Sequence, residues 1–274
     1  MGLIKFNFLS RVLREYTNVT VVLPTLTHQE VEENPNATYV SGTKFQTLYL
    51  LHGVTGDDSH WGRFTSVERY AQNNKIALVM PSADNGFYSD LVDGRRYWTF
   101  ISEELPNIAR AYFPLSEKRE DNFVAGLSMG GHGAMAWAIK RPEMFSTAVC
   151  LSGASIGPDD IIAFSNRSNG FLHLENMLGD LSNFKGGPYD IYHFAKLNIG
   201  KNIQLPRFYF AVGSDDFGLH TVKKAADYLK ELGYSVKYEE KEGYEHEWDF
   251  WDLYIRKAIE EWLPLKRKPI LPDS

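Results

Sequence analysis

The stretch Asn122-Phe-Val-Ala-Gly-Leu-Ser-Met-Gly-Gly-His-Gly-Ala134 decides the fold that the sequence predicts. Its apolar first residues predict a buried strand over 122–126, and the residues that follow predict a helix over about 129–140. Between them lies a G-x-S-x-G pentapeptide centred on Ser128. Such a strand-turn-helix holds the serine on a strained tip with its Oγ above the sheet, and small neighbours are needed because bulky side chains would collide there.

Strands and helices alternate on both sides of this turn. We expect two leading strands over 3–9 and 17–23, and a polar loop over 25–44 that closes a hairpin. Further strands are predicted over 45–51, 76–80, 146–152, 207–212 and 234–239, with helices near 64–72, 98–112, 222–232 and 251–262. Leading strands followed by β-α alternation predict an α/β fold with a mostly parallel central sheet and helices on both faces.

The chain length of 274 residues fits one domain, residues 1–274. The regular pattern breaks over about 153–200, where glycine and proline recur. This stretch is too long for a plain connection, so we expect an inserted cap region over an active site.

Composition excludes several classes of protein. The 29 Lys and Arg against 35 Asp and Glu give a net charge of −6, which lacks the electrostatic footprint of a nucleic-acid binder. The single cysteine, Cys150, excludes an intrachain disulfide and a cysteine-based zinc site. The longest apolar runs, such as 76–80, are too short for a membrane span, and the first residues read as a strand rather than a secretion signal. We therefore expect a cytoplasmic protein with no membrane partner.

A nucleophilic serine needs a base, and five histidines follow Ser128 in the sequence. His132 lies one turn along the predicted elbow helix, where histidine more often packs or caps. The others before the last strand are His173 and His193 in the predicted cap and His220 at a helix start. His246 lies in the loop between the last strand and the last helix, from which a histidine can return over the serine. We therefore predict His246 as the base.

The acid that orients the base should lie between the serine and the histidine in the chain. Gly213-Ser-Asp215-Asp216-Phe-Gly218 follows a predicted strand at the carboxyl edge of the sheet, where ligands bind in such folds. Spacing alone does not separate Asp215 from Asp216. The spare aspartate would cap the helix that begins near residue 219.

An oxyanion formed at the serine needs two backbone N–H donors. One should belong to Met129, the residue after the nucleophile. The second should come from the loop after the strand 45–51, where His52-Gly53-Val54-Thr-Gly56 places the N–H of Val54. The same His52-Gly53 pair also serves as a tight exit from the strand.

The ordered set of motifs resembles the esterase D-type family of α/β-hydrolases, and within it the tributyrin esterases (EstA-like carboxylesterases). The motifs that carry the resemblance are Leu48-Tyr-Leu-Leu-His-Gly53, Met80-Pro-Ser-Ala-Asp-Asn-Gly-Phe-Tyr-Ser-Asp90, Glu103-Glu-Leu-Pro-Asn107, Gly126-Leu-Ser-Met-Gly-Gly131, Gly213-Ser-Asp-Asp-Phe217 and His246-Glu-Trp-Asp-Phe-Trp251. They cover nearly the whole chain. The register of the family's Gly-Thr-Glu-Asp motif implies that Asp216 is the acid, and the family's oxyanion donor maps to Val54. One departure is Tyr244-Glu245-His246, where relatives often carry Gly-Gly-His.

The resemblance implies a serine carboxylesterase that acts on short-chain acyl esters through a Ser128–His246–Asp216 triad and an acyl-enzyme. No metal and no cofactor are expected, and the expected partner is a small-molecule ester. Alternatives on the same scaffold are an S-formylglutathione hydrolase-like thioesterase and a feruloyl or acetyl-xylan esterase. A non-catalytic binding protein is disfavoured because all three triad residues are present in order. Oligomerisation is common among relatives, so a homo-oligomer stays open, but no stretch identifies an interface.

Aromatic residues gather around the predicted histidine. Seven fall within 21 residues of sequence: Tyr234, Tyr238, Tyr244, Trp248, Phe250, Trp251 and Tyr254. A second group flanks a loop at the predicted mouth of the site: Phe87, Tyr88, Tyr97, Trp98 and Phe100. Most should belong to the core, as aromatic residues usually do. We expect the remainder to build a wall that excludes water behind His246.

Overall fold

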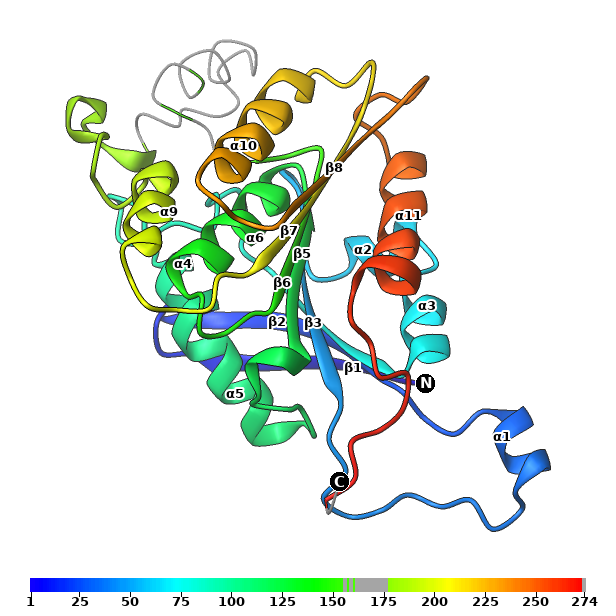
Figure 1. The fold of residues 1–274 in the computed structure, drawn as a ribbon. Helices are drawn as coiled ribbons and strands as arrows, with labels where there is room; N and C mark the ends of the chain where they lie inside the picture. Colours follow the sequence, from blue (N-terminus) through cyan, green and yellow to red (C-terminus); the bar gives the residue numbers. More distant parts are fainter. Residues whose placement is uncertain (155–156, 158–159, 161–176, 273–274) are drawn as a thin grey trace.

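A computed structural model describes residues 1–154, 157, 160 and 177–272 (Figure 1). The described residues contain an eight-stranded sheet of order β1-β2-β4-β3-β5-β6-β7-β8. Its strands are β1 (Gly2–Ser10), β2 (Glu15–Leu23), β3 (Gln46–Leu51), β4 (Ile76–Pro81), β5 (Asn122–Leu127), β6 (Thr147–Leu151), β7 (Arg207–Gly213) and β8 (Val236–Lys241). β1 and β2 pair antiparallel, β2 pairs antiparallel with β4, and the other neighbours are parallel. The predicted mostly parallel α/β sheet is confirmed.

Helices cover both faces of this sheet, as Figure 1 shows. Every residue of β3, β4, β5 and β6 is buried, which requires cover on both sides. One face carries α4 (Tyr97–Thr99), the π-helical turn η1 (Phe100–Glu104), α5 (Leu105–Tyr112), α6 (Met129–Lys140), α9 (Ile191–Ile199) and α10 (Leu219–Glu231). The other carries α2 (His60–Phe64), α3 (Val67–Asn74), α11 (Trp248–Lys257) and the π-helical turn η4 (Ala258–Trp262). Two short 3₁₀ turns lie in connections, η2 (Arg119–Asp121) and η3 (Leu181–Asn183).

Parallel pairing brings the ends of the central strands to one edge of the sheet. Leu51 of β3 lies opposite Gly126 of β5, and Leu127 of β5 lies opposite Leu151 of β6. Leu151 in turn lies opposite Ala211 of β7. The loops that follow these strands therefore meet at the same carboxyl edge, which is where open α/β sheets bind ligands.

The expectation that residues 25–44 close a hairpin is wrong. β2 pairs with β1 and β4, while β3 pairs with β4 and β5, so this connection crosses to the interior of the sheet. The hairpin instead joins β1 to β2, with Ser10 opposite Glu15. The crossing segment contains a short helix, α1 (His28–Glu33), which begins with a capping box between Thr27 and Glu30.

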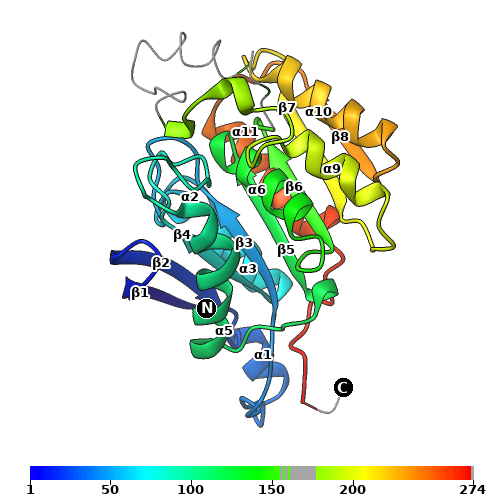
Figure 2. The ribbon, with the colours of Figure 1, turned by 90° about the vertical axis from the view of Figure 1, so that its left-hand side faces the viewer.

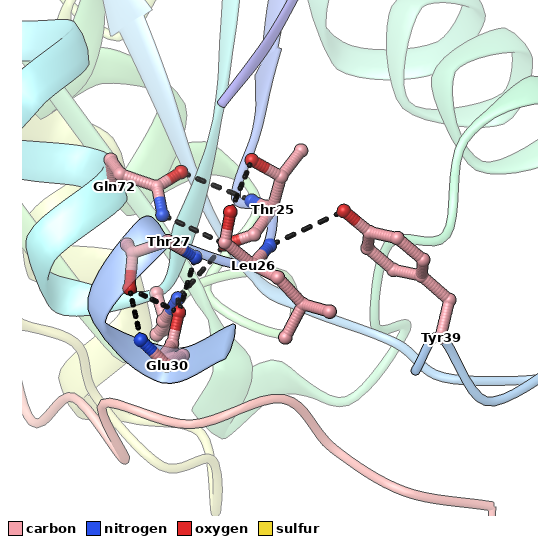
Figure 3. A network of polar contacts seen from close by, with 7 residues as sticks. Thr25, Leu26, Thr27, Glu30, Tyr39 and Gln72 are labelled. Atoms are coloured by element: carbon pink, nitrogen blue, oxygen red, sulfur yellow. Dashed lines mark hydrogen bonds and ion pairs between the residues drawn. The ribbon is translucent and has the colours of Figure 1, made fainter. Parts of the chain in front are cut away.

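A polar network fixes the start of this connection against α3 (Figure 3). The Gln72 side chain accepts from the Thr25 N–H at 3.0 Å and donates to the Thr25 carbonyl at 2.8 Å. The Glu30 carboxylate accepts from the Thr27 N–H at 2.7 Å and from Lys75 Nζ at 2.7 Å. The hydrogen bond from Lys75 is the main cause that lowers the pKa of Glu30 to about 2. These contacts hold a polar segment in place without an apolar core of its own.

The predicted cap over 153–200 falls partly outside the described residues, since 155–156, 158–159 and 161–176 are not described. Its last described part, α9, lies beside α6 in the helical layer (Figure 2). Asn198 of α9 donates from Nδ2 to the Ile139 carbonyl of α6 at 2.7 Å, and Ala195 is fully buried. Across the described ranges, the structure has no helix with the length and apolar character needed to cross a membrane.

Candidate active site

Ser128 sits on a strained turn between β5 and α6. Its backbone angles are φ 53° and ψ −119°, in a region that residues with a side chain rarely adopt. Two hydrogen bonds hold the turn, from the Ser128 N–H to the Leu151 carbonyl at 2.8 Å and from the His132 N–H to the Ser128 carbonyl at 3.1 Å. The turn thus raises the serine side chain above the carboxyl edge of the sheet.

Glycines make the turn possible because backbone segments meet there without room for a Cβ. A Cβ on Gly126 would lie 2.2 Å from the Gly130 carbonyl oxygen, and one on Gly153 would lie 1.9 Å from that of Ser128. Both distances are far below any real contact. The glycines of the G-x-S-x-G motif are therefore required by the packing of this turn. Gly153 of the neighbouring loop is required for the same reason.

Ser128, His246 and Asp216 form a continuous chain of hydrogen-bonding distances. His246 Nε2 lies 2.9 Å from Ser128 Oγ, and His246 Nδ1 lies 3.0 Å from each carboxylate oxygen of Asp216. Asp216 lies in the loop after β7, and His246 lies in the loop between β8 and α11. The structure thus brings together three residues that the sequence separates by as many as 118 positions.

The Asp216 side chain is fully buried and has further donors beside His246. The Gly218 N–H donates to Oδ1 at 2.7 Å, and the Ser152 hydroxyl also hydrogen-bonds the carboxylate. Burial acts to raise the pKa of Asp216, but the hydrogen bonds and charge interaction with His246, together with those other donors, outweigh it and lower the pKa. The carboxylate is therefore held as an anion that can stabilise a positive imidazole.

Asp215 is exposed and points elsewhere. Its carboxylate accepts from Ser214 Oγ at 3.1 Å, while its N–H donates to the Tyr244 carbonyl at 3.0 Å. The structure therefore places Asp216, and not Asp215, against the histidine. The expected role of the spare aspartate as a helix cap is wrong, because the residue before α10 is Gly218 and no side-chain cap is present there.

Among the described residues, His246 is the histidine at hydrogen-bonding distance from the Ser128 hydroxyl. His132 is buried in α6, where desolvation lowers its pKa to about 4, and it hydrogen-bonds the Ala154 backbone. His193 lies on α9 and His220 at the start of α10. His173 falls outside the described residues.

The loop after β3 is rigidly positioned beside the serine. His52 Nδ1 lies 2.7 Å from the Gly53 carbonyl, and the Ala83 N–H donates to His52 Nε2 at 3.0 Å. These contacts fix the turn that carries Val54, which lines one of the two hollows containing Ser128. Met129 lines the other and is the first residue of α6, where a backbone N–H has no acceptor within its own helix. Their role as oxyanion donors stays a prediction.

Aromatic rings enclose the imidazole on two sides. The ring centroid of Phe217 lies 4.3 Å from that of His246, and the ring of Trp251 meets it edge-on at 5.0 Å. Trp251 also donates from Nε1 to Ser152 Oγ at 3.0 Å, which links the aromatic wall to the Asp216 carboxylate.

Sequence reasoning missed Ser152 and several residues that line the hollows. Ser152 follows β6 at the same edge as Ser128, and its φ is 50°. The sequence Leu151-Ser-Gly153 gave no chemical motif, although a serine followed by glycine at the end of a buried strand is a usable signal. Among the residues that the structure describes, no group of three or more His, Cys, Asp or Glu side chains could hold a metal ion.

The architecture and the elbow define an α/β-hydrolase, the fold class that the sequence predicted. Residues 33–262 match the model of the family described as "Putative esterase", and the chain belongs to this family. The acetyl esterase of Caldicellulosiruptor saccharolyticus is 31% identical over 273 residues, which cover 96% of this chain and 98% of that protein.

Two solved structures from Staphylococcus aureus agree with this assignment. The fluorophosphonate-binding serine hydrolase FphF is 31% identical, with a TM-score of 0.80 over 94% of this chain and 96% of that chain. The S-formylglutathione hydrolase FrmB is 30% identical, with a TM-score of 0.77 over 94% and 97%. The chain is therefore an esterase of the carboxylesterase class, and the resemblance to esterase D-type α/β-hydrolases is confirmed. The finer likeness to tributyrin esterases stays a prediction.

Proposed function

We propose that this esterase hydrolyses esters of short acyl chains by acyl transfer to Ser128. The single observation that carries the proposal is the hydrogen-bonded chain from Ser128 Oγ through His246 to the buried Asp216. A neutral imidazole whose Nδ1–H donates to a carboxylate presents an unprotonated Nε2 to the serine hydroxyl, which is the arrangement a general base requires.

The mechanism proceeds in two halves. Ser128 Oγ attacks the ester carbonyl while His246 takes the hydroxyl proton, and the Asp216 carboxylate stabilises the imidazolium that forms. The N–H groups of Val54 and Met129 would donate to the oxyanion of the tetrahedral intermediate. His246 then gives its proton to the leaving alcohol, and a water molecule activated by the same histidine releases the acid from Ser128.

The preference for short acyl chains is supported by the size of one hollow beside the serine. It has a volume of about 190 Å³, and its lining combines apolar side chains, including Phe87, Met129 and Val222, with polar ones, including His132 and Thr221. A pocket of this size lies below the roughly 300–1,000 Å³ usual for drug-sized ligands. An acyl chain of a few carbons fits this description better than a long chain.

A thioester substrate is the second candidate, and one comparison favours it. The S-formylglutathione hydrolase FrmB shares 30% identity with this chain over nearly the whole length of both. A formyl group is the smallest acyl group, so it also suits the small hollow. The same serine chemistry cleaves oxygen esters and thioesters.

The test is a panel of p-nitrophenyl esters from acetyl to octanoyl, with S-formylglutathione and a feruloyl ester alongside. We expect kcat/KM to be highest for the acetyl to butyryl esters and to fall for longer chains. Ser128→Ala should lower kcat by a factor of order 10⁴–10⁶ on every substrate. Substantial turnover by this variant would refute the assignment of the nucleophile, and a preference for octanoyl would refute the acyl-chain proposal. A kcat/KM for S-formylglutathione far above that of any oxygen ester would favour the thioesterase.

A further inference from the structure

Two hollows meet at Ser128, and they differ in volume and lining. The smaller, of about 190 Å³, is lined by Met129, His132 and residues of α10. The larger, of about 690 Å³, is lined by Val54, His246 and residues of α2 and α11. Ser128 and Phe217 line both hollows. An ester bound at Ser128 therefore has two directions in which its two halves can extend.

The position of His246 decides which half of the ester lies in which hollow. The tetrahedral carbon carries Ser128 Oγ, the oxyanion, the acyl chain and the leaving oxygen. The leaving oxygen must face His246 Nε2, because that nitrogen delivers the proton that releases the alcohol. His246 lines the larger hollow. The alcohol half of the ester therefore extends into the larger hollow, and the acyl half into the smaller.

An aromatic platform, defined as Phe64 and Trp248, forms part of the larger hollow. The two rings stack with centroids 4.9 Å apart and an interplanar angle of 27°. Trp248 meets the edge of Trp251 at 5.1 Å, and Trp251 meets His246 at 5.0 Å. The platform is thus joined by ring contacts to the imidazole that would protonate the leaving group.

Neighbouring aromatic residues hold the platform, and its Phe64 side chain is partly exposed. Phe64 ends α2 and Trp248 begins α11, two helices on the same face of the sheet (Figure 1). Trp248 is held edge-on by Trp61, which is buried, at 5.7 Å. Phe64 in contrast is 47% exposed, so its ring is accessible from the hollow. The Arg63 guanidinium lies 5.7 Å from the Phe64 ring centroid, and His60 meets the ring edge-on at 5.2 Å. A partly exposed aromatic ring in the lining of a substrate hollow is a surface suited to stacking.

We propose that Phe64 and Trp248 form the alcohol subsite of this esterase, and that it selects esters whose alcohol carries a ring with a flat apolar face. The proposal rests on the function proposed above and extends it to the leaving group. An aryl alcohol and a sugar ring share this flat face. His60 and Glu247, which also line the larger hollow, offer hydrogen-bonding groups to substituents on the ring.

The experiment compares acetate esters that differ only in the alcohol. Benzyl acetate and methyl 6-O-acetylglucopyranoside present an aryl ring and a sugar ring, while hexyl acetate presents a flexible chain. The variant Phe64→Leu keeps an apolar side chain but removes the flat ring. Tyr112→Leu is the matched control, because Tyr112 is a 69% exposed aromatic residue on α5, on the other face of the sheet. Thr221→Leu, in the smaller hollow, tests the acyl side.

We expect Phe64→Leu to lower kcat/KM for a ring-bearing acetate, relative to hexyl acetate, by about 3- to 10-fold, which is the scale of one aromatic stacking contact. The ratio of butyryl to acetyl ester hydrolysis should not change in this variant. Thr221→Leu should do the reverse, lowering that acyl ratio and leaving the ring preference intact. Tyr112→Leu should change neither ratio. A loss confined to benzyl acetate or to the acetylated sugar supports the proposal and identifies the natural ring.

An unchanged ring preference in Phe64→Leu, with hydrolysis intact, overturns the alcohol subsite and leaves the proposed function standing. A change in the acyl ratio in place of the ring preference overturns the orientation of the ester. If the unaltered protein hydrolyses none of the esters, the proposed function itself fails and the subsite fails with it.

Discussion

The exchange of Asp216 for asparagine tests the carboxylate that lies against His246 Nδ1. Asparagine has the same shape as aspartate, so the buried site should still pack. The oxygen at Oδ1 accepts from the Gly218 N–H at 2.7 Å, and this contact will keep an oxygen there in the variant. The amide NH₂ must then take the place of Oδ2, which lies 3.0 Å from His246 Nδ1.

A donor in that place disfavours the working form of the imidazole, because its Nδ1–H would then face the amide NH₂ and keep only the oxygen at Oδ1, also 3.0 Å away, as acceptor. When Nδ1 accepts from the amide, the ring proton lies on Nε2 and faces Ser128 Oγ, which lies 2.9 Å away. A protonated Nε2 cannot take the hydroxyl proton. We expect Asp216→Asn to lower kcat by about 10⁴-fold, the scale known for loss of the correct tautomer in serine hydrolases, or about 5 kcal/mol of transition-state stabilisation.

The assay is the steady-state hydrolysis of p-nitrophenyl acetate at pH 7.5, with urea unfolding of each variant as a check on folding. Asp215→Asn is the matched control, because Asp215 is the adjacent, exposed aspartate whose side chain contacts Ser214. We expect this control to keep activity within about a factor of two, as surface substitutions usually have small effects. Equal losses in the two variants, or an Asp216→Asn protein with more than about a tenth of normal kcat, would refute the reasoning.

Three further predictions concern the surroundings of the site. Ser152→Ala removes the acceptor of the Trp251 indole N–H. It should lower the free energy of unfolding, measured by urea titration, by about 1–3 kcal/mol, and it should also reduce kcat. An unchanged free energy of unfolding would contradict the contact. Gly126→Ala should abolish or strongly destabilise the fold, because its Cβ would lie 2.2 Å from a backbone oxygen. Gly200→Ala is the control and should be tolerated, because the nearest atom to its Cβ would lie 3.9 Å away. Equal thermal unfolding midpoints for the two variants would contradict the close approach at Gly126. The pKa of His132 falls from 6.5 to about 4 on folding. Between these two pH values the histidine is therefore protonated in the unfolded chain and neutral in the folded chain. Stability should therefore fall between pH 6.5 and about 4, by roughly 2–3 kcal/mol at the acid end, and His132→Gln should remove this part of the slope of unfolding free energy against pH.

The sequence predicted the fold where the pattern is local. The helix after Ser128 runs over Met129–Lys140, as predicted, because a glycine-rich turn marks its start and Arg141-Pro142 follows its end. The path of residues 25–44 was not predictable in the same way. That segment is polar, and its course depends on the position of β4 between β2 and β3 in the sheet. This position is set by pairing between strands that are far apart in the chain. Even so, the capping box at Thr27 and Glu30 was a local signal of α1.

The candidate site likewise contains residues that local sequence patterns predicted and residues that only the folded structure could identify. The serine and the histidine could be predicted from their places at the ends of elements, but spacing did not separate Asp215 from Asp216. Their side chains diverge at one turn, and only the folded loop shows which faces His246. The contact of Phe64 with Trp248 joins helices at opposite ends of the chain, so no periodicity in the sequence could reveal it.

The central claim is that Ser128 is the nucleophile that carries the acyl group. The most direct measurement is the intact mass of the protein after reaction with a fluorophosphonate, followed by peptide mapping. We predict one adduct per chain, located on Ser128, in the unaltered protein and none in Ser128→Ala. An adduct on another residue, or equal labelling of Ser128→Ala, would contradict the account.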